Sequence, residues 1–214
     1  ATWRRFVPTL CLPALDEHPD SVFVEDTVVA IGNKAVITNP GHPSRRGEVD
    51  TIRDVLLQLG YETIEMRDNA SALCDGGDVL YTGRHLFVGL SERTNQEAVN
   101  ILAHAFNVDV IAVPFEGEAL HLKSIVTHMN ESTLLAPTGT LGDEVLKGMN
   151  AANLGYDSVR LPSMLACNVV AVNGCILAQD TGCKESKALL LQAARDLGLE
   201  IEFLDASEFA KCDG

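Results

Sequence analysis

The sequence lacks the long apolar runs of membrane proteins: no stretch of its 214 residues approaches the roughly 20 consecutive apolar residues that a membrane span needs. Basic residues are also scarce, with 16 Lys and Arg against 30 Asp and Glu, so the formal net charge is −14. Such a surface repels phosphate backbones and anionic lipids, which makes nucleic acid and membranes poor partners. A cationic or zwitterionic small ligand suits this charge better.

Several common catalytic and cofactor signatures are missing. The sequence has no GxSxG nucleophile elbow, no P-loop, no HExxH motif and no dinucleotide fingerprint. Its six cysteines include no CxxC pair, which argues against a structural zinc site. We therefore expect neither a metal nor a cofactor.

The N-terminal residues and the cysteines bear on localisation. Arg4 and Arg5 precede an apolar run over residues 6–15, a weak likeness to a signal peptide. Two prolines interrupt that run, and no A-x-A cleavage site follows it. The chain is also too long and too rich in apolar residues for a disulfide scaffold. We therefore expect a reducing compartment, the cytoplasm.

What the sequence does contain is a core-forming composition, 46% hydrophobic, and an internal repeat. Residues 22–31 and 35–38 have β-type patterns, and residues 48–59 carry apolar side chains at helical spacing. Gly60 supplies a left-handed helix cap, and residues 63–66 again have a β-type pattern. The predicted order is ββαβ.

The same order recurs three more times. The expected elements of these copies are 78–82, 86–90, 95–106 and 110–115; 122–127, 133–136, 143–154 and 158–161; and 168–172, 175–179, 185–197 and 200–204. The helix caps fall at 60, 107, 155 and 198, which are 47, 48 and 43 residues apart. Repeats of this length indicate a propeller, solenoid or radial array, because one copy cannot cover its own apolar faces. The chain stops about where a fifth copy would begin, so we expect a truncated ring in which residues 1–214 form a single domain.

Polar residues gather where each copy begins, and in a radial array such positions converge on the axis. Glu25 and Asp26 interrupt an apolar strand pattern. Burying carboxylates costs several kcal/mol unless a cation pairs with them, so this pair indicates either a cation-binding site or an exposed strand end. Asp75, in the turn Asp-Gly-Gly-Asp, and His121 open the next two copies. An acid that holds an imidazole is half of a nucleophile–base–orienter set.

Arg45 and Arg93 each stand just before an expected helix. Arginine binds carboxylates with two parallel hydrogen bonds, although a surface arginine that caps local structure has the same signature.

Five segments together resemble the dimethylarginine dimethylaminohydrolase family of the guanidino-modifying (pentein) superfamily. They are Phe-Val-Glu-Asp at 23–26, Pro-Ser-Arg-Arg at 43–46, Asp-Gly-Gly-Asp at 75–78, Gly-Leu-Ser-Glu-Arg-Thr-Asn at 89–95 and His-Leu-Lys-Ser at 121–124. The resemblance extends from about residue 12 to residue 214 and is closest between residues 22 and 124. Residues 1–11 show no convincing match.

The resemblance implies a fold and a reaction. The fold is a pentein-type α/β propeller of ββαβ units about a pseudo-axis, here with about four of five blades. The reaction is hydrolysis of N-methylated arginine to citrulline and a methylamine, a step of arginine metabolism and nitric oxide regulation. A cysteine thiolate attacks the guanidinium carbon, and a histidine protonates the leaving amine and then activates water. The implied partner is this small substrate, while the oligomeric state stays open.

The resemblance also implies roles for residues. His121 matches the catalytic histidine, and Asp75 matches the acid that orients it. The substrate-binding positions are matched by Asp20, Glu25, Asp26, Arg45 and Arg93, and by Cys212 and Asp213 in the C-terminal segment that lines the site. We expect these acids and arginines to face one central cavity with His121.

The sequence departs from the family in two places. The family's nucleophilic cysteine would follow a few residues beyond Gly214, so the chain as given is expected to be inactive alone, and the family's N-terminal loop is also missing. Cys74 is a poor substitute, because it lies in a turn where the family has no nucleophile. Two alternatives stay open: a catalytically inactive short form that binds arginine analogues, and a metal-dependent hydrolase that uses His121, Asp75 and Asp78.

Overall fold

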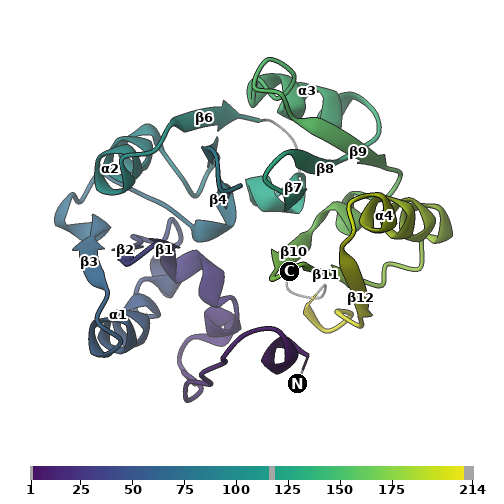
Figure 1. Ribbon diagram of the computed structural model, residues 1–214. Helices are drawn as coiled ribbons and strands as arrows, with labels where there is room; N and C mark the ends of the chain where they lie inside the picture. The colour runs from purple at the N-terminus through teal and green to yellow at the C-terminus, as the bar shows by residue number, and fades with distance from the viewer. Residues whose placement is uncertain (1, 116–118, 210–214) are drawn as a thin grey trace. The chain divides into compact units, whose positions relative to one another are not determined.

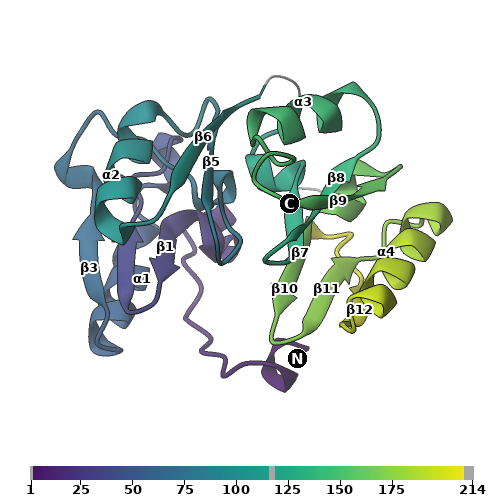
Figure 2. The same cartoon turned by 45° about the horizontal axis from the view of Figure 1, so that its top comes forward.

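A computed structural model describes residues 2–115 and 119–209 of the chain. The chain divides into two compact units: Ala14–Leu122, and a second unit that combines Ala1–Pro13 with Lys123–Gly214. They are called here the 14–122 unit and the 123–214 unit, and each is described by itself. Each contains two ββαβ repeats (Figures 1 and 2).

The 14–122 unit is built from two three-stranded sheets, β1-β2-β3 and β4-β5-β6. In each sheet the first two strands form an antiparallel hairpin, and the helix returns the chain so that the third strand pairs parallel with the second. The elements are β1 Val28–Ile31, β2 Lys34–Ile37, α1 Val49–Gln58, β3 Glu62–Glu65, β4 Val79–Tyr81, β5 Leu86–Leu90, α2 Gln96–Phe106 and β6 Val110–Pro114. In the first hairpin Val28 lies opposite Ile37.

The 123–214 unit repeats this topology in the sheets β7-β8-β9 and β10-β11-β12. Its elements are β7 Thr127–Asn130, β8 Thr133–Pro137, α3 Thr140–Gly148, β9 Asp157–Leu161, β10 Val169–Val172, β11 Cys175–Gln179, α4 Lys184–Asp196 and β12 Glu200–Leu204. Asn173 and Gly174 close the second hairpin with positive φ angles of 45° and 79°, as a two-residue turn between twisted strands requires. The predicted α/β architecture of four ββαβ copies is confirmed.

Three of the four predicted caps end their helices, whereas Gly155 lies seven residues beyond the last residue of α3 and does not cap it. The four expected cap residues all adopt left-handed backbone, with φ of 83° at Gly60, 52° at Asn107, 73° at Gly155 and 65° at Gly198. At the other end of α2, the side chain of Asn95 accepts a hydrogen bond from the backbone of Ala98 at 3.2 Å. None of the helices in the described residues has the length and apolar character that crossing a bilayer would require.

The second helix of each unit joins its two sheets. Helix α2 contacts β6 of its own sheet and β2 of the preceding one, and α4 contacts β12 and β9 in the same way. The cores beneath them include fully buried Met66 and Leu102 in the 14–122 unit, and Leu135 and Ile176 in the 123–214 unit. Full burial of such a side chain contributes about 1.5–3 kcal/mol. The repeats therefore bury their apolar faces in pairs.

Short 3-10 turns precede the first strand of every repeat. They are η3 Val24–Thr27, η6 Gly76–Asp78, η7 Leu122–Ser124 and η8 Met164–Cys167. The predicted strands 22–31 and 122–127 are therefore wrong at their starts, because β1 begins at Val28 and β7 at Thr127. An apolar run such as residues 22–24 has the composition of a strand, yet here the amide of Asp26 bonds back to the carbonyl of Phe23 at 3.2 Å and turns the chain.

Helix α3 also differs from its predicted range of 143–154, since it spans Thr140–Gly148. Asn150 adopts a left-handed φ of 55°, and the amide of Ala151 donates to the carbonyl of Leu146 at 3.0 Å. These two features end the helix at Gly148, about two turns before Gly155.

Candidate active site

The candidate site lies in the 14–122 unit, where the turns η3 and η6 contact one another. Asp26 is in η3, Asp75 directly precedes η6, and Asp78 ends it. All three carboxylates are buried, with at most 3% of each residue exposed. Glu25 and Asp26 thus occupy a turn rather than the strand that the pattern predicted.

Gly76 and Gly77 allow this close approach of the two turns. A Cβ on Gly76 would lie 1.9 Å from the backbone oxygen of Glu25, which is impossible. A Cβ on Gly77 would lie 2.6 Å from Nδ1 of His121 and 2.8 Å from Oδ1 of Asp26. The space that a side chain at residue 77 would fill is therefore the space between the imidazole and the carboxylate.

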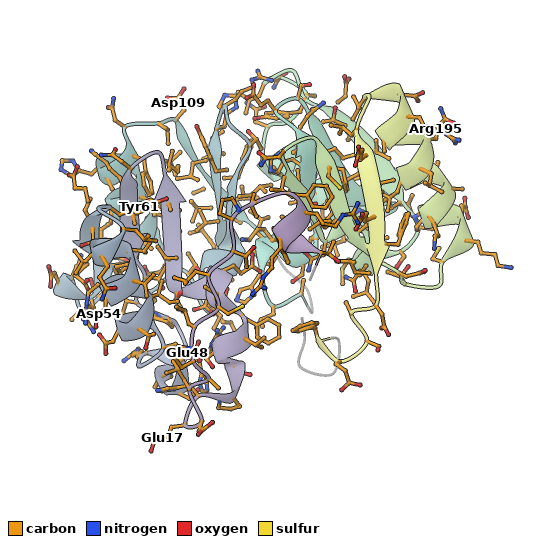
Figure 3. All side chains as sticks on the ribbon, turned by 60° about the horizontal axis from the view of Figure 1, so that its bottom comes forward. Glu17, Glu48, Asp54, Tyr61, Asp109 and Arg195 are labelled. Atoms are coloured by element: carbon orange, nitrogen blue, oxygen red, sulfur yellow. The ribbon has the colours of Figure 1, made fainter. Side chains whose placement is uncertain are left out.

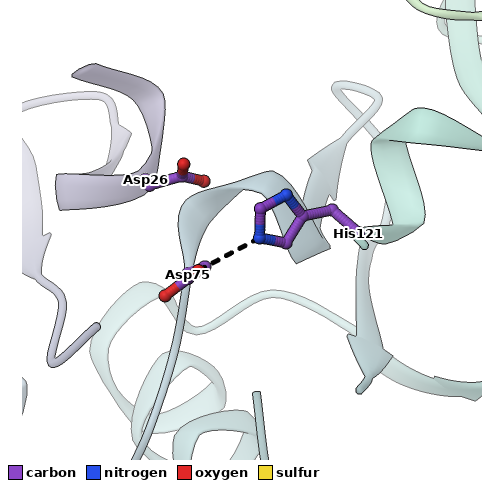
Figure 4. A group of neighbouring side chains, drawn as sticks. All are labelled: Asp26, Asp75 and His121. Carbon is purple, nitrogen blue, oxygen red and sulfur yellow. Dashed lines mark hydrogen bonds and ion pairs between the residues drawn. The ribbon is translucent and has the colours of Figure 1, made fainter. Parts of the chain in front are cut away.

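Asp75 holds His121. Nε2 of the ring lies 3.0 Å from Oδ2 of Asp75, as Figure 4 shows. The other oxygen of Asp75 accepts from the amide of Gly41 at 2.9 Å, and the amide of Asp75 donates to Oγ1 of Thr94 at 3.1 Å. An ionised carboxylate only accepts, so Nε2 is the protonated nitrogen and Nδ1 carries the lone pair of the neutral ring. Nδ1 has no hydrogen-bond partner among residues 2–115 and 119–209.

Asp26 approaches the same imidazole from a different segment (Figure 4). Its Oδ1 accepts from the amide of Gly77 at 2.7 Å, and its Oδ2 accepts from Nη1 of Arg45 at 2.5 Å. Hydrogen bonds to a charged group contribute about 1.5–3 kcal/mol, so this carboxylate is fixed from two sides.

Arg45 is itself buried, with 6% exposure, and its guanidinium is extensively bonded. Nε lies 3.1 Å from both carboxylate oxygens of Glu48, and Nη2 lies 2.7 Å from Oε2 of that residue. Nη2 also donates to the carbonyls of Asp20 and Phe23, at 3.1 and 3.2 Å. Arg45 therefore ties η3 and the preceding turn to the start of α1.

Asp78 supports the segment that carries His121. Its Oδ1 accepts from the amide of Leu122 at 2.9 Å, and its Oδ2 accepts from Oγ of Ser91 at 2.6 Å. Burial raises the pKa of Asp78, and the hydrogen bond from Ser91 and the charge of His121 offset this only partly. Asp78 thus fixes the backbone next to the imidazole.

The environment of His121 and Asp75 shifts the pKa of both residues. Burial lowers the pKa of His121, but the hydrogen bond to Asp75 and the charges of Asp26 and Asp78 raise it above its ordinary value overall. Burial likewise raises the pKa of Asp75, while the hydrogen bonds from His121 and Gly41 bring it below the ordinary value. The site therefore favours an ionised carboxylate beside an imidazole that gains a proton readily.

Cys74 adjoins this cluster and is completely buried. Burial, and then the negative charges of Asp78 and Asp75, raise the pKa of its thiol above the ordinary range. A thiol of this kind stays protonated at neutral pH, and a protonated thiol is a poor nucleophile. This agrees with the prediction that Cys74 does not serve as the nucleophile.

Asp26, Asp75 and His121 also offer three potential metal ligands, whose nearest oxygen and nitrogen atoms all lie within 4.8 Å of one another. Both carboxylates already bind protein donors, Arg45 and Gly77 on one side and Gly41 and His121 on the other. A metal ion would have to displace some of these bonds.

The predicted site residues fall into three groups. Asp26, Asp75 and His121 meet directly, and Arg93 joins them with Nη1 at 3.6 Å from Oδ2 of Asp75. The second group is set back: Arg45 reaches the cluster through Asp26, Asp20 contributes its backbone carbonyl to Arg45, and the side chain of Glu25 is exposed. The third group, Cys212 and Asp213, lies outside the described residues.

Comparisons with known proteins identify the family of the chain. Residues 10–172 match the family described as "N,N dimethylarginine dimethylhydrolase, eukaryotic". The chain belongs to the dimethylarginine dimethylaminohydrolase family. A curated dimethylarginine dimethylaminohydrolase of Streptomyces coelicolor is 34% identical over 209 residues, which cover 96% of this chain and 75% of that protein. The human putative hydrolase DDAH2 is 35% identical over 159 residues, 73% of this chain and 55% of that protein.

The solved structures extend the likeness to three dimensions. A cysteine-to-serine variant of the Pseudomonas aeruginosa dimethylarginine dimethylaminohydrolase, in complex with citrulline, superposes with a TM-score of 0.81 at 28% identity, covering 95% of this chain and 76% of that one. The predicted family and its pentein-type α/β fold are therefore confirmed.

Four residues that no sequence pattern singled out support this site. Glu48, Ser91, Thr94 and Gly41 all bond directly to a predicted site residue. Only Glu48 left a recognisable signal, since it stands three residues after Arg45 and directly before a helix. The other three contribute a hydroxyl or a backbone amide that no residue pattern distinguishes.

Proposed function

We propose that this chain is a dimethylarginine dimethylaminohydrolase that hydrolyses N-methylated arginine to citrulline and a methylamine. The observation that carries the proposal is the buried pair of His121 and Asp75, 3.0 Å apart, beside a second buried carboxylate on Asp26. A guanidinium is a delocalised planar cation, and carboxylates that accept parallel hydrogen bonds are its natural partners.

The charge of the site favours a cationic substrate. Asp26, Asp75, Asp78 and Glu48 bring four negative charges, whereas Arg45 and Arg93 bring two positive ones, so the cluster is net negative even before Glu25 is counted. A protonated His121 still leaves an excess of negative charge. Buried negative charge of this kind is stabilised when a guanidinium enters. We propose that Asp26 and Glu25 bind the substrate guanidinium, and that Asp20 and Arg93 bind its amino-acid end. Arg45 is proposed to contribute to substrate binding through Asp26, since its guanidinium is already bonded to Asp26 and Glu48.

His121 supplies the proton chemistry. Because Asp75 holds Nε2–H, Nδ1 is the nitrogen that exchanges a proton with the substrate. In its protonated form His121 donates this proton to the methylamine as the C–N bond breaks. In its neutral form it then takes a proton from water, which attacks the same carbon. The raised pKa of His121 keeps the acid form available near neutral pH.

The covalent steps follow the family mechanism. A cysteine thiolate adds to the guanidinium carbon, the methylamine leaves with the proton from His121, and water then displaces the thiolate to give citrulline. Cys74 takes no part, since its thiol is buried and protonated.

Localisation and domain organisation are also proposed. Cys74, Cys167 and Cys175 are buried free thiols, which suits the reducing cytoplasm. The common ββαβ topology of both units supports the proposal that residues 1–214 form one α/β-propeller domain. The expected partner is the methylated arginine itself.

The test measures binding and turnover together. Nω,Nω-dimethylarginine is titrated into the protein by calorimetry, and citrulline is assayed in the 214-residue chain and in a form extended by a family-like cysteine segment. We expect citrulline only from the extended form, in which His121→Ala should lower citrulline formation by about 10²–10⁴-fold, the usual contribution of a general acid–base group. His104→Ala, an exposed histidine on α2, is the matched control and should leave turnover unchanged.

Two outcomes would contradict the proposal. Binding without citrulline in either form would leave only a protein that binds arginine analogues. Loss of activity in both histidine variants alike would remove His121 from the chemistry.

A further inference from the structure

We propose that Glu48 is a positioning residue that balances the charge of Arg45 and so leaves the carboxylate of Asp26 available to a cationic ligand. Glu48 touches neither His121 nor Asp75, and its effect passes through Arg45. The identity of the cationic ligand rests on the proposed function, whereas the electrostatic role of Glu48 does not.

The guanidinium of Arg45 lies between the carboxylates of Glu48 and Asp26 and bonds to both. Arg45 directs Nε and Nη2 at Glu48, with contacts of 3.1, 3.1 and 2.7 Å, and only Nη1 at Asp26. The side chains of all three residues are at most 7% exposed, so solvent screens their charges little. The positive charge of Arg45 is therefore shared between two carboxylates.

The net charge of Glu48, Arg45 and Asp26 depends on Glu48. Glu48, Arg45 and Asp26 carry −1, +1 and −1, so the group is net −1 and that charge lies on the side of the imidazole. With a neutral residue at position 48 the group would be net 0, and Asp26 would be fully neutralised by Arg45. A carboxylate in that state attracts a guanidinium much less.

Glu48 is only 2% exposed, so the groups next to it in the fold decide what its carboxylate interacts with. It directly precedes α1, a helix of ten residues, so the positive end of the helix dipole faces its backbone. Arg45 is the only described residue that donates hydrogen bonds to its carboxylate. Glu48 thus fixes the guanidinium of Arg45, and Nη1 of that guanidinium in turn binds the carboxylate of Asp26.

His121 provides a measurement that needs no ligand. The groups that face its ring are Asp75, Asp26 and Asp78, with Arg93 behind Asp75. Asp26 helps to raise the pKa of His121, so any change in the net charge at Asp26 changes that pKa.

The experiment compares Glu48→Gln with Asp54→Asn, which removes one charge from an exposed acid on α1 (Figure 3 labels both residues). Affinity is measured for Nω,Nω-dimethylarginine, a cation, and for citrulline, a neutral molecule of similar shape. We expect Glu48→Gln to weaken binding of the cation roughly tenfold and to change citrulline binding less than about twofold. In the free protein, NMR titration should show a lower pKa of His121. Asp54→Asn should change none of these quantities.

A double variant separates charge from structure. Glu48→Gln with Arg45→Gln removes one charge of each sign, so Asp26 regains its net negative charge. The ratio of cation to citrulline affinity and the pKa of His121 should then return toward their wild-type values. A structural role predicts further loss in the double variant.

The outcomes are distinguishable from those of the proposed function. Equal weakening of both ligands by Glu48→Gln, or an unchanged pKa of His121, would overturn the role of Glu48. If the wild-type protein binds neither ligand, the proposed function fails, and the titration of His121 alone decides the role of Glu48.

Discussion

The two units of the chain share one topology but bury different kinds of side chain. In the 14–122 unit the buried residues include Asp26, Arg45, Glu48, Asp78 and the pair Asp75–His121. In the 123–214 unit the buried polar residues among those described are Thr127, Thr133 and Ser186, which carry no charge. The same arrangement of strands and helices therefore accepts either a charged or an apolar interior at its turns.

The difference lies in how the turns before the strands are joined. In the 14–122 unit the amide of Gly77 donates to the carboxylate of Asp26 at 2.7 Å. In the 123–214 unit Oγ1 of Thr127 donates to the carbonyl of Cys167 at 2.5 Å, a bond between neutral groups. A neutral hydroxyl holds the turn with little desolvation cost, whereas the desolvation of a buried carboxylate is offset by its pairing with Arg45. The 14–122 unit accepts that cost at the place where a cation is proposed to bind.

The largest expected effect is on stability, when a buried arginine of the 14–122 unit and a more exposed arginine of the 123–214 unit are each replaced. Arg45→Met should lower the free energy of unfolding by about 3–5 kcal/mol, because it leaves two buried carboxylates without a cation. Arg160→Met is the control from the other unit: Arg160 pairs with Asp143 at 2.7 Å, but 29% of its side chain and 68% of that of Asp143 are exposed. Its loss should cost about 1 kcal/mol or less. Similar costs in urea denaturation would show that the two interiors are not different.

A smaller effect comes from two glycines with the same steric problem. A Cβ on Gly76 would lie 1.9 Å from the oxygen of Glu25, and one on Gly142 would lie 1.9 Å from the oxygen of Pro137. Each Gly→Ala change should destabilise its unit by about 1–3 kcal/mol. Only Gly76→Ala should also shift the NMR signals of the His121 ring, since η6 separates Asp75 from Asp78. A shift of those signals in Gly142→Ala would contradict the assignment of the site to residues 14–122.

The smallest effect is the pH dependence of stability. The raised pKa of His121 stabilises the folded protein below the unfolded histidine pKa of about 6.5, and this contribution disappears as pH rises through the folded value. The lowered pKa of Asp75 stabilises the folded protein above the unfolded aspartate pKa of about 4. This contribution disappears as pH falls through the folded value. The stability difference between wild type and Asp75→Asn should therefore be largest between about pH 5 and 6.5. The same substitution at exposed Asp109 is the control for the loss of one surface charge.

Much of the fold was accessible from local patterns. Helix caps at Gly60, Asn107 and Gly198 were predicted because a left-handed residue after an amphipathic helix has a distinct sequence signature, whereas the end of α3 at Asn150 was not. The 3-10 turns were not, since residues 22–24 are apolar and resemble a strand until the hydrogen bond from Asp26 to Phe23 is seen. Within the site, Asp26, Asp75 and His121 were identified through resemblance. The pairing of Arg45 with Glu48 was not identified, because a spacing of three residues is compatible with such a pair but does not show that both side chains are buried.

The four separate sheets have a consequence for how such a protein diverges. The strand ladders of β1-β2-β3, β4-β5-β6, β7-β8-β9 and β10-β11-β12 are each complete within one repeat. A substitution that alters the start of one copy therefore needs no compensating change in the strand pairing of another. The acids of the turns η3 and η6 and the Met-Leu-Ala-Cys sequence of the turn η8 therefore stand before sheets with the same strand pairing. Modular backbone pairing thus separates the evolution of the chemistry from the inheritance of the fold.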